Sequence, residues 1–285
     1  MNIILAGNNL RGVTLLKFLN KNKKINIKLI ITHSYASKSE YFVNLKKTAR
    51  ELNLKTYQPK NINSKISQLI IKKLKPDLII MCGYSQCILK KNILSIPKFG
   101  VWNLHASDLP KYRGASPLNW ALRNGEKKIG ISIIQANEYL DKGNILIKKK
   151  IKLSKKDNIR TLAKKVNESY PFLTMKLINL LKQKKIKEIK QKNNPTYFTR
   201  IRNEDLFLRF ETASSSSIIN IIRSACYPYP RSYFYYLNKK IEVSEKFKIL
   251  KLRSYYPGKI IKRKNTYLCR CTDRFIELKQ FNKKN

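Results

Sequence analysis

Short apolar runs alternate with segments of helical periodicity in the first part of this chain, and this alternation constrains the fold more than any other feature. Runs suited to strands occupy residues 2–6, 25–31, 54–57, 77–81 and 100–105, and helical patterns occupy residues 10–19, 40–52 and 64–74. The run at 77–81, DLIIM, is typical of a strand buried on both faces. The repeated strand–helix–strand order predicts a Rossmann-like α/β fold, with a mostly parallel sheet and helices on both sides.

The first strand leads into Gly7, where a dinucleotide-binding fold would carry its glycine-rich turn. The residues there are GNNLRG, which lack the G-x-G-x-x-G spacing that lets a pyrophosphate approach the backbone. We therefore expect the topology without the dinucleotide site, so NAD is disfavoured. Further helices are predicted at residues 115–123 and 158–181, and further strands at 130–135 and 144–151.

The residue pattern of the sequence changes near residue 190. Residues 182–194 consist almost entirely of Lys, Gln, Asn and Ile, and we interpret them as a linker. Beyond it, residues 233–243 and 259–278 alternate polar and apolar residues and carry aromatics, with a turn at Pro257-Gly258. These patterns predict two domains, an α/β domain at 1–185 and a small C-terminal β-barrel-like (OB-like) domain at 195–285, read as a five-stranded barrel fragment.

The chain is strongly basic, with 61 Lys and Arg against 17 Asp and Glu and a formal net charge of +44. One interpretation is a polyanionic partner such as RNA or a phosphate-bearing substrate. The other is compositional drift in an AT-rich genome, which also enriches Lys, Asn and Ile. Because the lysines are spread along the whole chain and not clustered, drift is the favoured interpretation, although the field still attracts phosphates at low salt.

The cysteine and histidine content argues against a metal site. There are five Cys and two His, and no Cys-x-x-Cys pair occurs. The N-terminal MNIILAGNN lacks the basic region of an export signal, and no stretch reaches the roughly 18 apolar residues of a membrane helix. We therefore expect a cytoplasmic protein that uses no metal.

One constellation of residues has the elements of carbonyl chemistry. Asn103 and His105 share one face of the predicted strand at 100–105, at the carboxyl end where open α/β sheets place their ligands. Asp141 lies in a predicted turn between two later strands. Such chemistry needs a group to polarise the oxygen, a group to manage the proton of the attacking amine, and a group to orient the imidazole. An amide, an imidazole and a carboxylate can supply these roles.

The segments around these residues resemble one family. NLHASDLPKYRGASPLNWAL followed by QANEYLDKGNIL is similar to the formyltransferases that use 10-formyltetrahydrofolate. The match combines Asn-x-His, a Ser-Leu-Leu-Pro-x-x-Arg-Gly-like loop and an Asp in a D-x-G turn, and PYPRSYFYY resembles the family's C-terminal domain. The resemblance implies the formyltransferase fold, a Rossmann-like catalytic domain followed by an open-barrel β domain, and an amine acceptor that attacks the formyl carbon.

The resemblance also implies roles for individual residues. Asn103 and protonated His105 would stabilise the oxyanion, and Asp141 would orient His105 and help to take the amine proton. Arg113 and Gly114 would contact the acceptor. The residues expected to bind the folate lie in three segments: Cys87, Ile88 and Leu89; Ser107, Asp108, Leu109 and Pro110; and Asn137, Glu138, Tyr139 and Leu140.

The acceptor that the resemblance favours is a nucleotide-linked 4-amino sugar. Methionyl-tRNA formyltransferases usually carry a long basic insertion after the second strand, and the corresponding segment here, THSYASKSEYFVNLKKTARELN, lacks it. The segment PLNWALRNGE is also similar to the sugar-modifying members. Ala115 stands where the member acting on a UDP-linked sugar is expected to carry Arg, so the nucleotide stays open.

Four other functions compete with this one. Methionyl-tRNA formyltransferase is the first alternative, with the charge of +44 as its best support. A basic RNA-binding protein on a degenerate formyltransferase scaffold is the second, and the intact Asn103, His105 and Asp141 argue against it. Glycinamide ribonucleotide formyltransferase and formyltetrahydrofolate hydrolase share the three residues but generally lack the C-terminal β domain. The sequence carries no signal for the oligomeric state.

Overall fold

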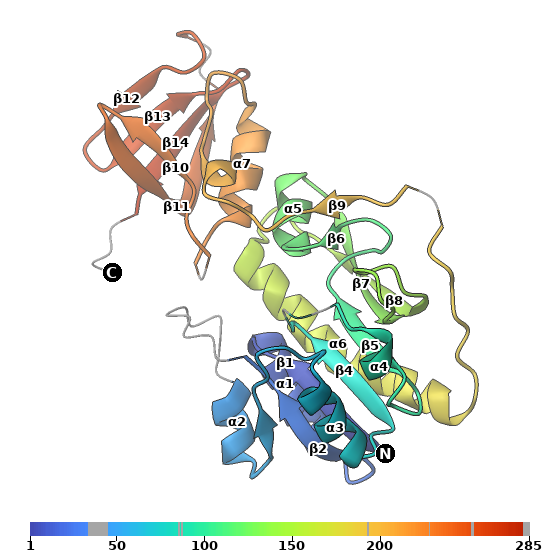
Figure 1. The fold of residues 1–285 in the computed structure, drawn as a ribbon. Helices are drawn as coiled ribbons and strands as arrows, with labels where there is room; N and C mark the ends of the chain where they lie inside the picture. Colours follow the sequence, from blue (N-terminus) through green and yellow to red (C-terminus); the bar gives the residue numbers. More distant parts are fainter. Residues whose placement is uncertain are drawn as a thin grey trace. The chain divides into compact units, whose positions relative to one another are not determined.

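The structure is a computed structural model, and it describes residues 1–33, 45–84, 86, 88–192, 194–227, 229–251 and 254–281. The chain divides into two compact units (Figure 1). The first unit contains Met1–Gly114, Ile129–Ile151 and Lys164–Tyr197, and the second contains Ala115–Lys128, Lys152–Ala163 and Phe198–Asn285. The chain therefore enters the second unit three times. The single division predicted between residues 185 and 195 stays a prediction.

A seven-stranded sheet forms the centre of the first unit. Its strands are β1 (Asn2–Gly7), β2 (Asn26–Ile31), β3 (Thr56–Tyr57), β4 (Leu78–Cys82), β5 (Val101–His105), β7 (Lys128–Gln135) and β8 (Ile145–Lys152). The strand order is β3-β2-β1-β4-β5-β7-β8, with parallel pairing from β3 to β5 and antiparallel pairing of β5 with β7. The predicted mostly parallel α/β sheet is confirmed.

Helices pack on this sheet. Their apolar residues repeat at helical spacing, so each helix has one apolar side that can be buried against the strands. They are α1 (Leu10–Asn20), α2 (Leu45–Glu51), α3 (Lys65–Lys73), α4 (Lys91–Leu94) and α6 (Ile159–Lys182). Asn9 caps α1 and Ser64 caps α3, each by accepting hydrogen bonds from first-turn N–H groups. Of the helix predicted at 40–52, residues 40–44 lie outside the described residues, and the four-residue helix α4 was not predicted.

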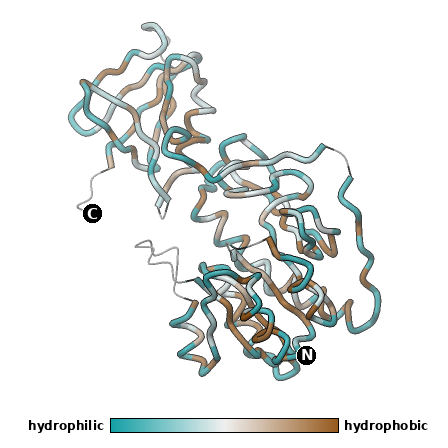
Figure 2. The backbone as a smooth tube through the Cα atoms, in the orientation of Figure 1, coloured by the Kyte–Doolittle hydropathy of each residue, from teal (hydrophilic) through white to brown (hydrophobic). Residues whose placement is uncertain are grey.

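One face of the sheet packs on α3 and α4. The buried cluster there contains Ile4, Ile79, Val101, Ile71 of α3 and Ile93 of α4, and Figure 2 shows hydrophobic segments along the central strands. Val101 shares this face with Asn103 and His105, because alternate residues of a strand point the same way. On this face of β5, the buried side chain of Val101 is therefore followed by the two polar side chains at the carboxyl end of the strand.

The second unit is built on a curled antiparallel sheet (Figure 1). Its elements are α5 (Pro117–Arg123), a 3-10 turn (Glu204–Leu206), α7 (Ser215–Ser224), β10 (Tyr233–Tyr236), β11 (Lys239–Leu250), β12 (Ile260–Lys262), β13 (Thr266–Arg270) and β14 (Phe275–Gln280). The strand order is β10-β11-β14-β13-β12. Ile218 and Ile222 of α7 pack with Phe234 and Leu278 in one buried cluster. The predicted β-barrel-like C-terminal domain is confirmed as this five-stranded half-barrel.

Two short strands, β6 (Arg113–Gly114) and β9 (Tyr197–Phe198), pair with each other in a separate sheet. Their pairing brings the loop after β5 alongside the chain that follows α6. Within the described residues, no helix is both long and apolar enough to cross a membrane.

Candidate active site

Strand β5 presents the first two site residues at its carboxyl end. Asn103 pairs with Ile134 of β7, and His105 pairs with Ser132. Trp102 and Leu104 point to the opposite face and are almost fully buried, which fixes the side on which the polar residues emerge. The imidazole of His105 is itself 7% exposed, so the ring lies inside the protein and its orientation is set by its neighbours.

Asp141 reaches the same place from the loop between β7 and β8. Its backbone φ is 54°, in the left-handed region that Asp tolerates better than most residues. Two residues on, a Cβ added to Gly143 would lie 1.7 Å from the carbonyl oxygen of Gln135, so the loop is folded tightly back onto the end of β7. Since β7 pairs with β5, this tight return carries Asp141 to the end of β5.

The three predicted catalytic residues meet at the carboxylate of Asp141. Asn103 Nδ2 donates to Asp141 Oδ1 over 3.0 Å, and His105 Nδ1 lies 3.3 Å from the same oxygen. The second oxygen, Oδ2, accepts from the backbone N–H of Gly114 over 2.9 Å. The carboxylate is therefore surrounded by donors and is only 6% exposed as a residue. Residues 38 positions apart in the chain, Asn103 and Asp141, are joined directly.

The surroundings of His105 indicate where its protons lie. Nε2 is 2.8 Å from the backbone carbonyl oxygen of Tyr112, which can only accept a hydrogen bond. Nδ1 faces an ionised carboxylate, which also can only accept. Both ring nitrogens find a complementary partner only when both carry a proton. The arrangement thus suits a positively charged imidazole held beside a negative carboxylate.

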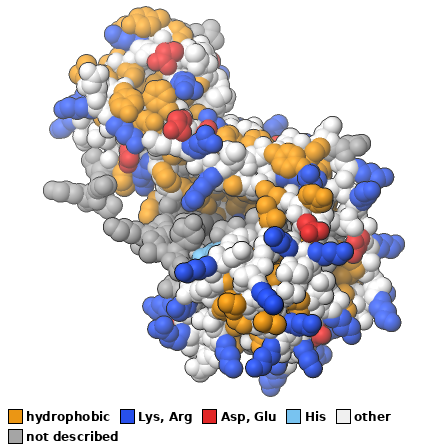
Figure 3. Space-filling view, in the orientation of Figure 1, with side chains coloured by type: hydrophobic (Ala, Val, Ile, Leu, Met, Phe, Trp, Pro, Cys, Tyr) orange, Lys and Arg blue, Asp and Glu red, His pale blue; other side chains and the backbone are white. Residues whose placement is uncertain are grey.

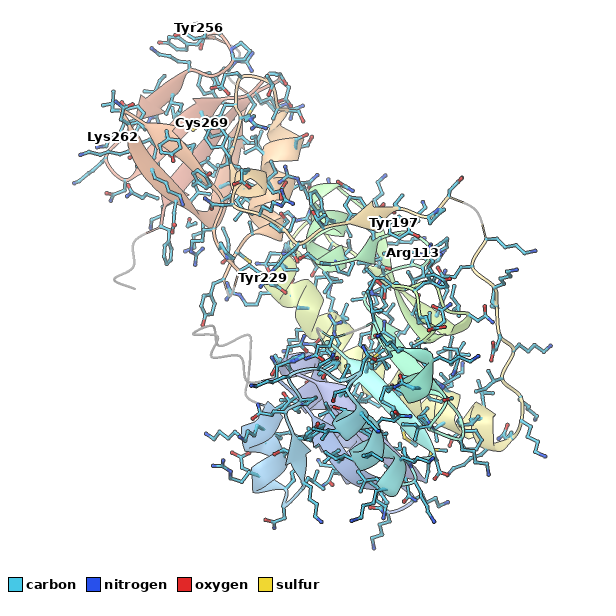
Figure 4. The ribbon with its side chains drawn as sticks, viewed as in Figure 1. Arg113, Tyr197, Tyr229, Tyr256, Lys262 and Cys269 are labelled. Carbon is cyan, nitrogen blue, oxygen red and sulfur yellow. The ribbon has the colours of Figure 1, made fainter. Side chains whose placement is uncertain are left out.

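Arg113, predicted to contact the acceptor, is engaged inside the protein. It is 6% exposed, its Nε and Nη2 donate to Gln191 Oε1 over 3.1 and 2.7 Å, and its Nη1 donates to the hydroxyl of Tyr197 over 2.6 Å. The guanidinium also lies over the ring of Tyr197, and Figure 4 shows these two side chains close together. Contact of Arg113 with an acceptor stays a prediction. Gly114 contacts the site through its backbone N–H, which donates a hydrogen bond to Asp141 Oδ2.

Gln191 is a site neighbour that sequence reasoning missed. Its Nε2 donates to the backbone carbonyl oxygens of Asp141 (2.8 Å) and Gly143 (2.7 Å), on either side of the tight return. It lies in the polar stretch that the sequence analysis assigned to a linker. Hydrogen bonds from one side chain to distant main-chain carbonyls leave no periodicity or motif, so no signal in a single sequence could have identified it.

Two of the predicted folate-binding segments come together. Glu138 Oε1 accepts from the backbone N–H of Lys91, 3.3 Å away, which joins the start of α4, two residues after Leu89, to the loop after β7. Ile88 and Tyr139, one from each loop, are 52% and 65% exposed and leave apolar surface uncovered, while Leu89 is buried. Asn137 is exposed and Leu140 is partly buried. Cys87 lies outside the described residues.

The third predicted folate-binding segment, residues 107–110, is held rigidly. Ser107 and Leu109 have no exposed surface, and the Ser107 hydroxyl donates to the carbonyl of Lys111 over 2.8 Å. Lys148 forms an ion pair with Asp108 and donates to the carbonyl of Leu109 over 2.7 Å. The partly exposed residues are Asp108 and Pro110. The buried side chains of Ser107 and Leu109 hold the conformation of this loop. Binding of folate by the segment stays a prediction.

Among the described residues, the cysteine at the end of β4 offers no reactive thiol. Cys82, at the end of β4, is fully buried, and burial raises the pKa of its thiol to about 12, so the thiol stays protonated near neutral pH. Within the described ranges, no three His, Cys, Asp or Glu side chains are grouped so that they could hold a metal ion. The chemistry that the geometry supports is polar catalysis by an amide, an imidazole and a carboxylate.

Comparisons with known proteins agree with this geometry. Residues 1–177 match the formyl transferase family model, and residues 200–285 match the model of the formyl transferase C-terminal domain. The chain is 35% identical over 252 residues to the bifunctional polymyxin resistance protein ArnA of Wigglesworthia glossinidia brevipalpis, covering 87% of this chain and 38% of that protein. It is 37% identical over 218 residues to the methionyl-tRNA formyltransferase of Clostridium tetani, covering 76% and 70%.

Solved structures show the same fold. The structure of WlaRD, a sugar 3N-formyl transferase in the presence of dTDP and 5-N-formyl-THF, superposes with a TM-score of 0.75 at 22% identity, covering 99% of this chain and 98% of that one. A methionyl-tRNA formyltransferase from Clostridium thermocellum superposes with a TM-score of 0.59 at 20% identity, covering 99% and 100%. The two domain matches, the identities and the meeting of Asn103, His105 and Asp141 lead to one conclusion: the chain belongs to the formyl transferase family.

Proposed function

We propose that this protein is a cytoplasmic enzyme that transfers the formyl group of 10-formyltetrahydrofolate to the amino group of a nucleotide-linked 4-amino sugar. The observation that carries the proposal is the meeting of three side chains from two distant segments at one carboxylate. Asn103 Nδ2 is 3.0 Å from Asp141 Oδ1, and His105 Nδ1 is 3.3 Å from the same atom. Carbonyl transfer to an amine needs these three kinds of group in one place.

Each residue has a defined part in the transfer. The donor supplies an activated formyl carbon, and the acceptor amine attacks it to form a new carbon–nitrogen bond. The bond between the formyl carbon and the donor nitrogen then breaks, and tetrahydrofolate leaves with a proton on that nitrogen. Asn103 Nδ2 carries two hydrogens, one of which engages Asp141, so the other is available to the formyl oxygen as that oxygen gains negative charge. The positive charge of the His105 ring stabilises the same oxygen. Asp141 accepts the proton that the attacking nitrogen releases.

The donor end of the site is supported by the loops after β4 and β7. The hydrogen bond from Lys91 N–H to Glu138 joins the start of α4, which follows the first loop, to the second loop. The exposed faces of Ile88 and Tyr139 offer apolar surface, which suits the flat ring of a pterin. The buried segment at Ser107 and Leu109 provides a stiff wall, because its hydroxyl and carbonyl groups are already bonded within the protein.

A sugar-nucleotide acceptor is supported by two features of the sequence. The segment after β2 lacks the long basic insertion expected of a methionyl-tRNA formyltransferase. The segment PLNWALRNGE resembles the sugar-modifying members; its helix α5 is tied to α7 by a hydrogen bond from Asn119 Nδ2 to the carbonyl of Ser224.

Methionyl-tRNA is the second candidate acceptor. The net charge of +44 favours a polyanion, and the similarity to the Clostridium tetani enzyme spans 76% of the chain. Figure 3 shows the Lys and Arg side chains scattered over the visible face among apolar and uncharged polar ones. A dedicated RNA site would be expected to gather them into a patch or stripe, and on this face they lie scattered.

The deciding experiment offers the purified protein 10-formyltetrahydrofolate with one acceptor at a time. The acceptors are dTDP-, UDP- and GDP-linked 4-amino sugars and initiator Met-tRNA. Mass spectrometry of the products detects the 28-Da gain of a formyl group replacing hydrogen, a value that follows from the formula of the group. Formylation of an amino sugar at a rate well above that of Met-tRNA supports the proposal. Formylation of Met-tRNA alone would replace the sugar with the second candidate.

A further inference from the structure

We propose that Gln191 is the positioning residue of this active site, holding the turn that presents Asp141. The inference rests on the proposed formyl transfer for its meaning in catalysis, but the geometry behind it is independent of the acceptor. Among the hydrogen bonds of the described residues, none joins Gln191 to Asn103 or to the ring of His105. It acts on the site through the backbone that carries the carboxylate.

All the hydrogen-bonding groups of the Gln191 amide are engaged. Its two N–H groups donate to the carbonyls of Asp141 (2.8 Å) and Gly143 (2.7 Å), and its oxygen accepts from Arg113 Nε (3.1 Å) and Nη2 (2.7 Å). A guanidinium can only donate and a carbonyl can only accept, so the amide has one orientation. The assignment of its oxygen and nitrogen therefore follows from its partners.

These bonds close a ring around the carboxylate. Arg113 is followed directly by Gly114, whose N–H donates to Asp141 Oδ2 over 2.9 Å. Gln191 thus ties the main chain of Asp141 to the side chain of Arg113, while the side chain of Asp141 is tied to the next residue of the same segment. With both the backbone and the side chain of Asp141 fastened to residues 113–114, the carboxylate has little freedom to turn away from His105.

The segment that carries Gln191 is itself anchored on both sides. Before it, Ile189 exchanges two backbone hydrogen bonds with Ile145 at the start of β8, of 2.8 and 2.9 Å. After it, the hydroxyl of Thr196 accepts from Tyr112 N–H over 2.8 Å, and the carbonyl of Thr196 accepts from Arg113 N–H over 2.8 Å. The polar stretch after α6 therefore works as a strap across the catalytic loops, with Gln191 at its centre.

Loss of the strap's central amide should release the turn. Asp141 has a left-handed φ of 54°, a conformation that persists in a non-glycine residue when surrounding contacts enforce it. Without the two donors of Gln191, the carbonyls of Asp141 and Gly143 would need other partners, and the turn would relax. A displacement of about 1 Å at a catalytic group is enough to cost up to about 100-fold in rate.

The test compares Gln191→Ala and Gln191→Glu with Gln183→Ala and Gln183→Glu. Gln183 is an exposed glutamine just after α6, so it is the matched control. Glu at 191 keeps the size and the acceptor for Arg113 but cannot donate to the two carbonyls. We expect both Gln191 variants to lower kcat by about 10- to 100-fold with KM for the donor within about twofold of wild type, and both Gln183 variants to match wild type.

A second readout does not depend on turnover. The chain has only two His, so a ¹⁵N-histidine spectrum shows two rings, and His33→Gln assigns them. We expect a protected Nδ1–H signal from His105 in the wild type, held by Asp141, and its loss in both Gln191 variants while the His33 signals stay in place. The folded state of every variant is checked by thermal unfolding.

The outcomes separate this inference from the proposed function. Wild-type kcat together with an unchanged His105 Nδ1–H signal in either folded Gln191 variant would overturn the inference. If Gln191→Ala does not fold, Gln191→Glu decides in the same way. If the wild type formylates none of the acceptors but the Gln191 variants lose the Nδ1–H signal, the positioning role stands and the proposed reaction fails.

Discussion

The carboxylate of Asp141 accepts hydrogen bonds from Asn103 Nδ2 and Gly114 N–H and lies 3.3 Å from His105 Nδ1, and Gln191 donates to the backbone carbonyls of Asp141 and Gly143. The donors differ in kind. Asn103 and His105 are the groups proposed to act on the formyl oxygen, whereas Gly114 and Gln191 hold the carboxylate in position. Because one residue connects the two sets, substitutions at 141 should affect the chemistry more than substitutions at any of its single partners.

Asp141→Asn should lower kcat by on the order of 10²–10⁴, since an amide cannot accept the proton or hold the charged imidazole. The control is Asp77→Asn: this carboxylate accepts from the N–H of Asn2 over 2.7 Å at the opposite, amino end of β4. Steady-state rates with the best acceptor measure both. A loss of less than about tenfold for Asp141→Asn would remove Asp141 from the role of proton acceptor.

Gly143→Ala tests the tight return of the chain. The added Cβ would sit 1.7 Å from the carbonyl oxygen of Gln135, and backbone cannot give way as a flexible side chain can. We expect a lower melting temperature and a loss in kcat of up to about 100-fold, because the displaced turn carries Asp141. Thermal unfolding and kcat are measured on the same preparation. A variant that matches wild type in both would show that the turn has more room than the structure gives it.

The three catalytic residues could be found from the sequence, and Gln191 could not. Asn103 and His105 are two apart on a strand that is easily recognised, and Asp141 is followed by a glycine that the turn requires. Their side chains carry the chemistry, so they form a recognisable pattern. Gln191 contributes only through main-chain carbonyls and Arg113, and any stretch of polar residues could contain such a side chain.

At the scale of single elements, the helix and strand pattern was predictable where the apolar period was clear. Residues 233–243 were predicted to be β-rich from their alternation, and the turn between β10 and β11 inside this range was not predicted. The chain reverses at Leu237 and Asn238, both with positive φ, of 47° and 60°. Asn238 is a residue that commonly marks such a turn, but Leu237 occupies the position before it and continues the apolar run, which conceals the turn.

Helix α7 was missed for a different reason. It begins in a run of serines, SSSS at 214–217, that is typical of a loop. Ser214 is the N-cap, accepting from Ser217 N–H, and Ser215 donates to Asp273. The apolar residues that pack on the sheet come only afterwards. The serines therefore start the helix by capping it, and their composition concealed that role.

The turn between β1 and α1 gives an element-scale prediction. In Gly7→Ala the Cβ would lie 2.7 Å from the carbonyl oxygen of Cys82, whereas in Gly12→Ala it would meet ordinary contacts from 3.5 Å. Gly12 lies within α1, where Ala is favoured by about 0.5–1 kcal/mol over Gly. We expect Gly12→Ala to stabilise the protein by roughly that amount and Gly7→Ala to destabilise it. Denaturant unfolding of both variants provides the comparison, and equal effects would contradict the geometry.

At the scale of the whole molecule, the fold does not explain the high positive charge. The net charge of +44 is distributed over both units, and the sheet topology needs none of it. The order and periodicity of the apolar residues predicted the α/β class and the β-rich domain, because the pattern of burial dictates both. The purpose of the charge could not be predicted, since scattered lysines arise both from drift and from binding of a polyanion.

Salt dependence separates these two origins. If the acceptor is a nucleotide-linked sugar, few phosphates are contacted, and KM should rise by less than about tenfold between 50 and 200 mM salt. A tRNA acceptor that meets 6–10 phosphates would lose about 10³–10⁵ in affinity over the same range. The measurement is KM for each acceptor across that range, with the KM for the donor as the internal control. A steep dependence for the sugar would contradict drift as the whole origin of the charge.

The strap after α6 has a practical consequence for anyone building chimaeras in this family. The match to the catalytic family model ends at residue 177, which invites a junction there. Such a junction would keep Asn103, His105 and Asp141 but take Gln191 and Thr196 from the donor protein, whose loops were not shaped for this turn. Placing the junction after Tyr197 would transplant the C-terminal half-barrel while leaving every recorded hydrogen bond of the turn native to its own chain.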